Sequence, residues 1–335
     1  MIQLTGIKLV DDRDRWDAFV RAHPYGHFFQ SWDWGVLQEA LDARPVRIAN
    51  SASDDHRIIS AVQLFIFEGS KRFAVIPRGP VSDPAVALGE LLDAALRVAA
   101  AAGAQLVRME PQWPYDPAIV ERLQRGGFAE TKQHIMPPRT LLVDLRPSVE
   151  EIWNGLRSNT RNRIRLAEKR GVTVRVGAEA DVPEFVRLFD ETSARHGLRL
   201  GRSEMFAQAA RLFGRDERMR LYLACDEGAI LAGIMVFIWG ATATYLWGAS
   251  SSSERARSLN PNQLLHWTAM QWARERGCAT YDLFGIPDLD AESLEKQYAT
   301  QSGGWWNLYR FKRGFGGTVH RHLGTFDCRI ATRES

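Results

Sequence analysis

The sequence repeats one order of predicted elements in its two halves, and this duplication constrains the fold more than any other feature. In the first half, residues 57–69 and 71–80 are predicted to be paired strands, followed by a helix over about 83–102 and a strand over 104–111. In the second half, a hairpin over 220–240, a strand over 242–250, a helix over 261–276 and a strand over 279–287 follow in the same order. A glycine after each helix, Gly103 and Gly277, is suited to end it.

Each half then closes with a further helix and strand, over 117–135 and 303–324. Hairpin, strand, helix, strand, helix, strand is the order of an N-acetyltransferase (GNAT)-like fold, so we expect an α/β (α+β) chain with two tandem GNAT-like domains. An ordinary doubly wound sheet is the alternative, but the antiparallel hairpin before each first helix argues against it. The domain boundary is predicted near residue 146, where prolines precede a short strand and Ser148 and Glu151 form a capping-box pattern.

Composition limits the class of protein. The 335 residues carry a formal net charge of only +3, so attraction to a polyanion must come from local clusters of charge. The three cysteines are far apart, which argues against a disulfide framework. With no signal-peptide pattern and no apolar run long enough to span a bilayer, we expect a cytoplasmic protein.

A basic helix is predicted at the start of the second half. Residues 157–175 hold seven cations against one acid, Glu168. Four of these cations are spaced by four residues and therefore share one helix face: Arg157, Arg161, Arg165 and Lys169. The face either contacts phosphates or is the solvated side of an amphipathic helix; the unpaired stripe needs acids from elsewhere in the fold or a polyanion.

The sequence lacks the patterns of several common enzymes. Enzymes that use acyl-CoA hold its pyrophosphate on a glycine-rich loop at a helix N-terminus, but the corresponding residues 247–265 have no closely spaced glycines. The helix there is predicted to start with Asn260 as N-cap and Pro261 at the first position. These observations disfavour acyl-CoA as donor, and no metal site or other cofactor is expected, because no HExxH, CxxC, GxSxG or phosphate-loop pattern occurs.

Four motifs, in the same order, resemble the Fem-type (FemABX) peptidoglycan bridge peptidyltransferases. They are HPYGHFFQSWDWG, GLRSNTRNRIRLAEKRGV, the long segment YLWGASSSSERARSLNPNQLLHWTAMQWARERGCATYDLFGIP, and NLYRFKRGFGG. The resemblance implies that residues 318–335 return to complete the first domain, which gives domains of 1–146 plus 318–335 and 147–317. It also implies a helical-hairpin arm in many relatives, for which residues 184–218 are too short here, so we expect no long coiled-coil arm.

The resemblance implies an aminoacyltransferase. Its members move an amino acid from aminoacyl-tRNA to an amino group on the stem peptide of a peptidoglycan precursor, either UDP-MurNAc-pentapeptide or lipid II. For this chain we therefore expect a monomer with, at most, peripheral contact to the inner face of the membrane. Two alternatives stay open: a GNAT-fold acyltransferase that uses acyl-CoA or another activated donor, and a non-catalytic RNA-binding module.

Conversion of an aminoacyl ester into an amide is downhill, so the site needs mainly to position an amine and to stabilise the oxyanion. By resemblance, Lys312 in the closing motif supplies the cation, although a surface lysine is the alternative. Arg310 and Arg313 of the same helix are expected to hold tRNA phosphates.

Five residues are expected to contact the precursor. Resemblance suggests Arg202 for the diphosphate, with Phe206 where relatives often have tyrosine and Gln38 where they often have lysine. Glu110 is expected near the acceptor amine, or alternatively in a salt bridge with Arg108. Tyr245 is a candidate pocket aromatic, with a place in the core as the alternative.

Overall fold

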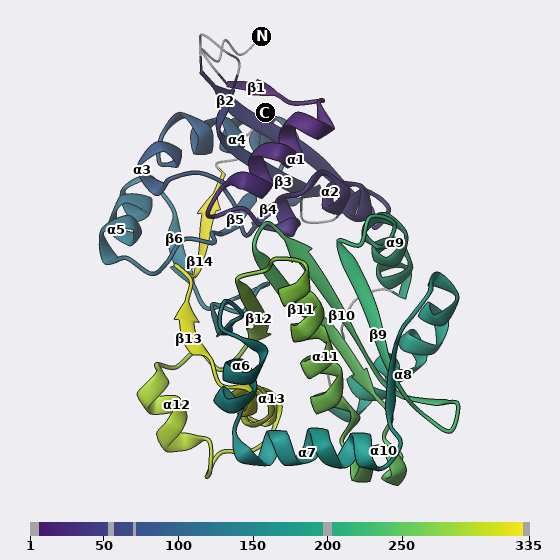
Figure 1. Cartoon of the computed structure of the whole chain (residues 1–335). Helices are drawn as coiled ribbons and strands as arrows, with labels where there is room; N and C mark the ends of the chain where they lie inside the picture. Colours follow the sequence, from purple (N-terminus) through teal and green to yellow (C-terminus); the bar gives the residue numbers. More distant parts are fainter. Residues whose placement is uncertain (1–6, 53–56, 70–71, 197–202, 331–335) are drawn as a thin grey trace. The chain divides into compact units, whose positions relative to one another are not determined.

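The chain divides into two compact units. The computed structural model describes residues 7–52, 57–69, 72–196 and 203–330 (Figure 1). Unit 1 comprises Met1–Pro138 and Arg321–Ser335, and unit 2 comprises Arg139–His320. The division after Pro138 differs from the expected boundary at residue 146, because the strand β7 (Arg139–Asp144) pairs antiparallel with β12 (Thr280–Gly285) in unit 2.

Unit 1 is built around one mixed sheet. Within the described residues it has seven strands in the order β1-β2-β3-β4-β5-β14-β6. Their bounds are β1 (Ile7–Leu9), β2 (Ala43–Ser51), β3 (Ile58–Phe67), β4 (Phe73–Pro77), β5 (Leu106–Glu110), β14 (Thr325–Arg329) and β6 (Ala129–Thr131). The helices are α1 (Arg13–Ala22), α2 (Trp32–Glu39), α3 (Pro84–Ala87), α4 (Glu90–Ala101) and α5 (Pro117–Arg125).

The predicted paired strands of unit 1 are present, since β3 and β4 pair antiparallel. The helix expected over 83–102 is instead two helices, α3 and α4. Leu88 and Gly89 leave the helical conformation, and the carbonyl of Gly89 accepts the first hydrogen bond of α4 from Asp93. Glycine is a poor helix former, so a break at this position costs little.

Unit 2 repeats this architecture. Its described strands form a seven-stranded sheet in the order β13-β7-β12-β11-β10-β9-β8. The further strands are β8 (Thr173–Val176), β9 (Met219–Asp226), β10 (Ala229–Trp239), β11 (Thr242–Ser250) and β13 (Thr318–Arg321). The helices are α6 (Val149–Gly155), α7 (Ser158–Lys169), α8 (Val182–His196), α9 (Ser203–Gly214), α10 (Glu254–Leu259), α11 (Pro261–Glu275), α12 (Ala291–Gln297) and α13 (Gly304–Lys312).

The two sheets match strand for strand when they are followed from β1 and from β8. Each has a parallel pair at the same place, β4 with β5 and β11 with β12, and a long helix, α4 or α11, joins the members of each pair. The sixth place is exchanged: β7, which follows β6 in the chain, lies in the second sheet, and β14, which follows β13, lies in the first. The predicted duplication is therefore present, with one strand traded in each direction.

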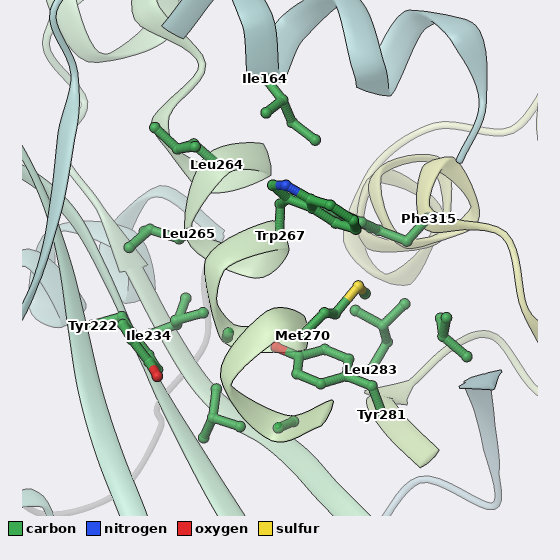
Figure 2. Close-up of a cluster of buried hydrophobic side chains, with 14 of the residues drawn as sticks. Ile164, Tyr222, Ile234, Leu264, Leu265, Trp267, Met270, Tyr281, Leu283 and Phe315 are labelled. Carbon is green, nitrogen blue, oxygen red and sulfur yellow. The ribbon is translucent and has the colours of Figure 1, made fainter. Parts of the chain in front are cut away.

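Helix α11 forms the centre of the unit 2 core. Figure 2 shows its side chains Leu264, Leu265, Trp267 and Met270 beside residues of the sheet such as Tyr281. At the first helix of unit 2, Ser148 and Glu151 form the predicted capping box at the start of α6. Among the described residues, none of the helices is both long and apolar enough to cross a membrane, and the cytoplasmic location stays a prediction.

Helices α8 and α9 lie in the region for which the resemblance implies an arm in many family members. Helix α8 packs on β11 and β10, and α9 packs on β9. The described part of residues 184–218 thus covers the sheet, as expected for a chain without a long coiled-coil arm.

We expect Gly317→Ala to destabilise unit 2 more than Gly171→Ala. Both glycines have a left-handed backbone, with φ of +87° and +85°, which costs a residue with a side chain about 1–2 kcal/mol. A Cβ at Gly317 would also lie 2.5 Å from the carbonyl oxygen of Leu142, whereas Gly171 faces open space. Chemical denaturation should show a loss of about 1–3 kcal/mol beyond that of Gly171→Ala, since overpacking adds to the backbone term. Equal losses would contradict the close approach of Gly317 to β7.

Candidate active site

The parallel strands of unit 2 part before they end. β11 and β12 pair from Thr242 with Thr280 to Thr244 with Asp282, although β11 continues to Ser250 and β12 to Gly285. In unit 1 the equivalent strands stay paired to the end of β4, where Pro77 lies opposite Glu110. Open sheets bind ligands outside the carboxyl ends of their strands, so the parted strands mark unit 2 as the place for a site.

Lys312 lies where these strands separate. It is the last residue of α13, its exposed fraction is 3%, and its Nζ donates a hydrogen bond of 2.6 Å to the carbonyl of Gly285 at the end of β12. Nζ also lies 5.6 Å from the centre of the Tyr245 ring of β11. This burial excludes the alternative of a surface lysine.

The surroundings of Lys312 bring its pKa close to neutral pH. Burial lowers the pKa of Lys312 to about 7, and the carboxylate of Asp282 acts in the opposite direction. On α11, burial and the neighbouring Lys312 charge lower the pKa of His266 to about 3, so this imidazole is neutral at neutral pH. Its Nδ1 lies 3.0 Å from the hydroxyl of Tyr281.

Tyr245 forms one wall beside Lys312. A register shift in the pairing of β10 with β11 falls between Met235 and Val236, opposite this part of β11, and such bulges redirect side chains. The Tyr245 ring meets the ring of His266 edge-on, with centroids 4.4 Å apart, and a Cβ at Gly248 would lie 2.1 Å from the Tyr245 hydroxyl. Burial raises the pKa of Tyr245 to about 12, so the hydroxyl stays protonated. The structure brings Tyr245 together with Lys312, and its contact with substrate stays a prediction.

The arginines of the closing motif form hydrogen bonds within unit 2, and their contact with tRNA phosphates stays a prediction. Arg313 forms an ion pair with Glu295 of α12, with Nε 2.9 Å from the carboxylate, and lies over the ring of Tyr298. The Arg313 guanidinium lowers the pKa of Glu295 to about 2. Arg310 donates to the carbonyls of Tyr298 and Gln301. Both arginines therefore hold the segment around α12 against α13.

The predicted basic helix is α7, and half of its stripe is also engaged within unit 2. Arg157 donates to the carbonyl of Arg313 and pairs with Glu295. Arg161 donates to the carbonyls of Asn154 and Leu156 at the end of α6, where carbonyls lack partners within the helix. Both have partners within unit 2, and their contact with phosphate stays a prediction.

The other two cations of the stripe face solvent. Arg165 and Lys169 are exposed, and the Arg165 guanidinium lies 5.3 Å from the centre of the Trp153 ring. They remain candidates for phosphate contact.

Glu110 serves unit 1 as a buried anchor. Its carboxylate accepts hydrogen bonds from the backbone N–H groups of Ile135, at 2.6 Å, and Met136, at 3.0 Å, and from the hydroxyl of Thr325, at 2.9 Å. The alternative partner, Arg108, is paired with Asp327 instead. A carboxylate with these partners ties the 132–138 segment to β5 and β14, and its expected role beside the acceptor amine stays a prediction.

Phe206, Gln38 and Arg202 were also expected to contact the precursor. Phe206 of α9 is 1% exposed and meets the rings of Phe189 and Trp247 edge-on, so it belongs to the core and the prediction of a substrate contact is wrong. Gln38 is half-buried on α2 of unit 1. Arg202 lies outside the described residues.

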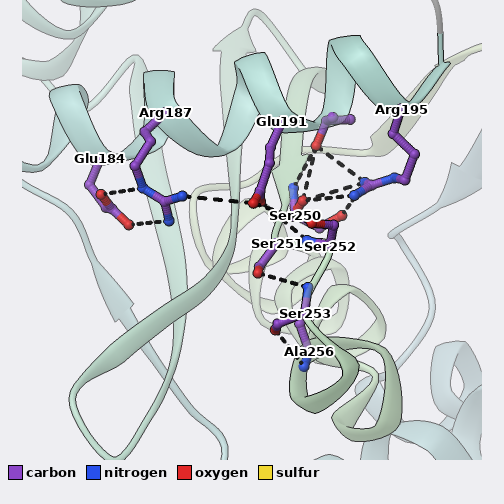
Figure 3. Close-up of polar contacts among 10 residues, drawn as sticks. Glu184, Arg187, Glu191, Arg195, Ser250, Ser251, Ser252, Ser253 and Ala256 are labelled. Atoms are coloured by element: carbon purple, nitrogen blue, oxygen red, sulfur yellow. Dashed lines mark hydrogen bonds and ion pairs between the residues drawn. The ribbon is translucent and has the colours of Figure 1, made fainter.

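The segment that would hold the pyrophosphate of acyl-CoA is tied into the fold. Figure 3 shows α8 above the serine run: the Thr192 hydroxyl and Arg195 donate to the Ser250 carbonyl, and Glu191 accepts from Ser252. The side chain of Ser253 caps α10 through the N–H of Ala256.

Helix α11 begins directly after α10, with a buried proline, Pro261, that has no N–H to offer. Asn260 precedes it as predicted, but in a left-handed conformation, and its side chain donates to the carbonyl of Ser258 rather than capping α11. The predicted N-cap position is thus confirmed, but it has no side-chain hydrogen bond to α11, and Asn260 also ends α10.

The sequence patterns missed the polar residues that surround Lys312. Asp282 and Tyr281 lie on β12 and His266 lies on α11, all buried. A carboxylate within an otherwise apolar strand, YDLFG, and a histidine on an apolar helix face were the available signals.

Comparisons with known proteins agree with this architecture. The family described as Acetyltransferase (GNAT) domain matches residues 154–298. The Lipid II:glycine glycyltransferase of Staphylococcus saprophyticus is 24% identical over 93% of this chain and 90% of its own length, and that of Staphylococcus aureus is 25% identical over the same shares. The crystal structure of FemX superposes with a TM-score of 0.82 at 23% identity and covers 97% of both chains. A tandem GNAT protein from the clavulanic acid biosynthesis pathway has a TM-score of 0.57 at 14% identity, covering 98% of this chain and 100% of its own.

The fold and the site thus define an acyltransferase with two tandem GNAT-like domains. Within this class, the resemblance to the Fem-type family that the four motifs indicated is confirmed along nearly the whole chain.

We expect Phe206→Ala to lower the free energy of unfolding by about 3–5 kcal/mol, because truncation leaves a cavity among buried rings. Trp305→Ala is the matched control: Trp305 is 50% exposed, and its truncation should change stability by no more than about 0.5 kcal/mol. Denaturant unfolding of both variants measures the difference. A small loss for Phe206→Ala, together with weakened substrate binding, would return Phe206 to the site.

Proposed function

We propose that this protein transfers an amino acid from aminoacyl-tRNA to an amino group on the stem peptide of a peptidoglycan precursor, either UDP-MurNAc-pentapeptide or lipid II. The observation that carries the proposal is the buried ammonium of Lys312 at the place where β11 and β12 part. The names of the staphylococcal relatives, lipid II:glycine glycyltransferases, support a peptidoglycan acceptor and make glycine the first amino acid to test.

The reaction is the aminolysis of an ester. The acceptor nitrogen attacks the ester carbonyl, a C–N bond forms, the C–O bond to the ribose breaks, and a proton that leaves the amine ends on the ribose oxygen. Negative charge develops first on the carbonyl oxygen and then on the leaving oxygen. A cation fixed in a buried site stabilises this charge more than a solvated cation would, and Lys312 in its protonated form supplies it.

Acyl-CoA is the less supported donor. The serine run is hydrogen-bonded to α8, and α11 begins with Pro261. The helix N-terminus that commonly receives a pyrophosphate therefore presents a proline and no free first N–H at this point.

The direct test offers the purified protein a mixed pool of charged tRNAs with UDP-MurNAc-pentapeptide, and in parallel with lipid II, and follows the mass of the acceptor. We expect the mass of one or more amino acids to be added, with loss of the signal after ribonuclease treatment. Acetyl-CoA in place of the tRNA pool should give no product; acylation from acetyl-CoA would overturn the proposal.

Lys312→Ala should reduce transfer by at least about 100-fold while precursor binding stays near that of the wild type, because one fixed donor to an oxyanion has this magnitude. The control is Lys296→Ala, which removes an exposed lysine of α12 that pairs with Glu292. Single-turnover transfer and calorimetric binding measure the two effects. Near-normal turnover of Lys312→Ala would remove it from the catalytic role.

The double variant Arg165→Gln/Lys169→Gln should weaken tRNA binding and lower the slope of log affinity against log salt by about 1.5, as expected for two lost phosphate contacts. Arg125→Gln/Lys296→Gln is the matched control, since both of its cations are exposed and each pairs with a glutamate four residues earlier. Filter binding over a range of salt concentrations gives both slopes. Equal slopes for the two double variants would make the exposed half of α7 a solvated surface.

A further inference from the structure

The end of β12 is bent, and hydrogen bonds to the carboxylate of Asp282 stabilise the bend. The pairing of β12 with β7 shifts register between Asp282 and Gly285, and Phe284 between them has a left-handed backbone with φ of +59°. An oxygen of Asp282 accepts a hydrogen bond of 2.7 Å from the N–H of Phe284 and another from the hydroxyl of Thr140 on β7. A bulky residue at positive φ costs about 1–3 kcal/mol and persists only where its neighbours hold it.

The bend carries the partner of Lys312. Gly285 follows Phe284 directly, lies opposite Thr140 in the sheet, and offers its carbonyl to Lys312 Nζ at 2.6 Å. A change in the Asp282 contacts therefore moves the acceptor that orients the ammonium. Both Asp282 and Thr140 are buried, so solvent does not replace these hydrogen bonds at low cost.

The charged and titratable groups around Lys312 come from several elements. Tyr245 faces it from β11, His266 from α11, and Tyr281 and Asp282 belong to β12. Two nearby arginines have their own acids: Arg139 of β7 pairs with Asp288, and Arg313 pairs with Glu295. Since the tyrosines and His266 are neutral at neutral pH, the charge that favours the ammonium of Lys312 comes from Asp282.

We infer that Asp282 is a positioning residue of this active site, which both fixes the carbonyl that orients Lys312 and keeps Lys312 protonated during transfer. The inference rests on the proposed function for its consequence in catalysis, whereas the effect on Lys312 itself is independent of that function.

The sign of the pH effect follows from the charge. If protonated Lys312 is the active form, transfer falls as pH rises through the pKa of Lys312, which is about 7. Asp282→Asn keeps an oxygen for the Phe284 N–H and removes the negative charge. The falling limb should therefore move to lower pH by about one unit, which is a loss of roughly tenfold near pH 8 and about twofold near pH 6.

Two variants separate charge from shape. Glu292→Gln removes an exposed carboxylate of α12, in the segment that follows β12, and should leave the pH profile unchanged, because Glu292 pairs with Lys296, which is also exposed. Thr140→Val keeps the Asp282 charge but removes the hydroxyl donor, so it should lower transfer several-fold with a much smaller movement of the limb.

The deciding measurement does not need activity. The chain has six lysines, so the Cε resonance of Lys312 in protein made with ¹³C-lysine can be assigned by its absence in Lys312→Ala and titrated by NMR. Asp282→Asn should lower the titration midpoint of Lys312, and Glu292→Gln should not. An unchanged midpoint in Asp282→Asn overturns the inference. A lowered midpoint in a protein that shows no transfer with any charged tRNA would retain the inference and reject the proposed function.

Discussion

The hydrogen bond from Lys312 Nζ to the carbonyl of Gly285 is the interaction on which the candidate site depends. Removal of an ammonium from water costs several kcal/mol, and the fold recovers part of this cost from a carbonyl, a tyrosine ring and a nearby carboxylate. These groups are available only because β11 and β12 stop pairing after Thr244 and Asp282. In unit 1 the equivalent strands stay together, and Glu110 at the end of β5 binds backbone N–H groups. The same architecture thus provides a candidate site in unit 2, where the strands part, and a hydrogen-bonded strand end in unit 1, where they stay paired.

The basic residues of unit 2 divide into two kinds. Arg157, Arg313 and Glu295 form one network that joins the start of α7, the end of α13 and α12. Arg161 completes the end of α6. Arg157 and Arg313 thus help to hold in place the helix that carries Lys312. Arg165 and Lys169 are exposed and remain the candidates for contact with a polyanion. Because the net charge of the chain is small, attraction to a polyanion must come from such local clusters.

Much of the fold could be predicted from sequence, because hairpins, helix caps and the duplicated order are local patterns. The boundary near residue 146 was placed too late because a strand's partner cannot be deduced from its own residues: β7 pairs with β12, far along the chain. The same limit applied to the site. Lys312 was identified by its motif, but the register shift that sets Asp282, Phe284 and Gly285 around it is a property of the sheet. Helical spacing predicted the stripe on α7, yet Glu295, which engages Arg157, lies 138 positions away.

The exchanged strands β7 and β14 have a consequence for how the protein is made. The sheet of unit 1 has β14 between β5 and β6, so this position is empty until residues 325–329 have been synthesised. β5 and β6 are synthesised before unit 2, and the edges that later pair with β14 stay unpaired until unit 2 has been translated. Unpaired edges of this kind attract other strands. β14, which completes the first sheet, follows the helix that bears Lys312 in the sequence. A nascent chain therefore completes its N-terminal unit only after its candidate catalytic residue has been synthesised.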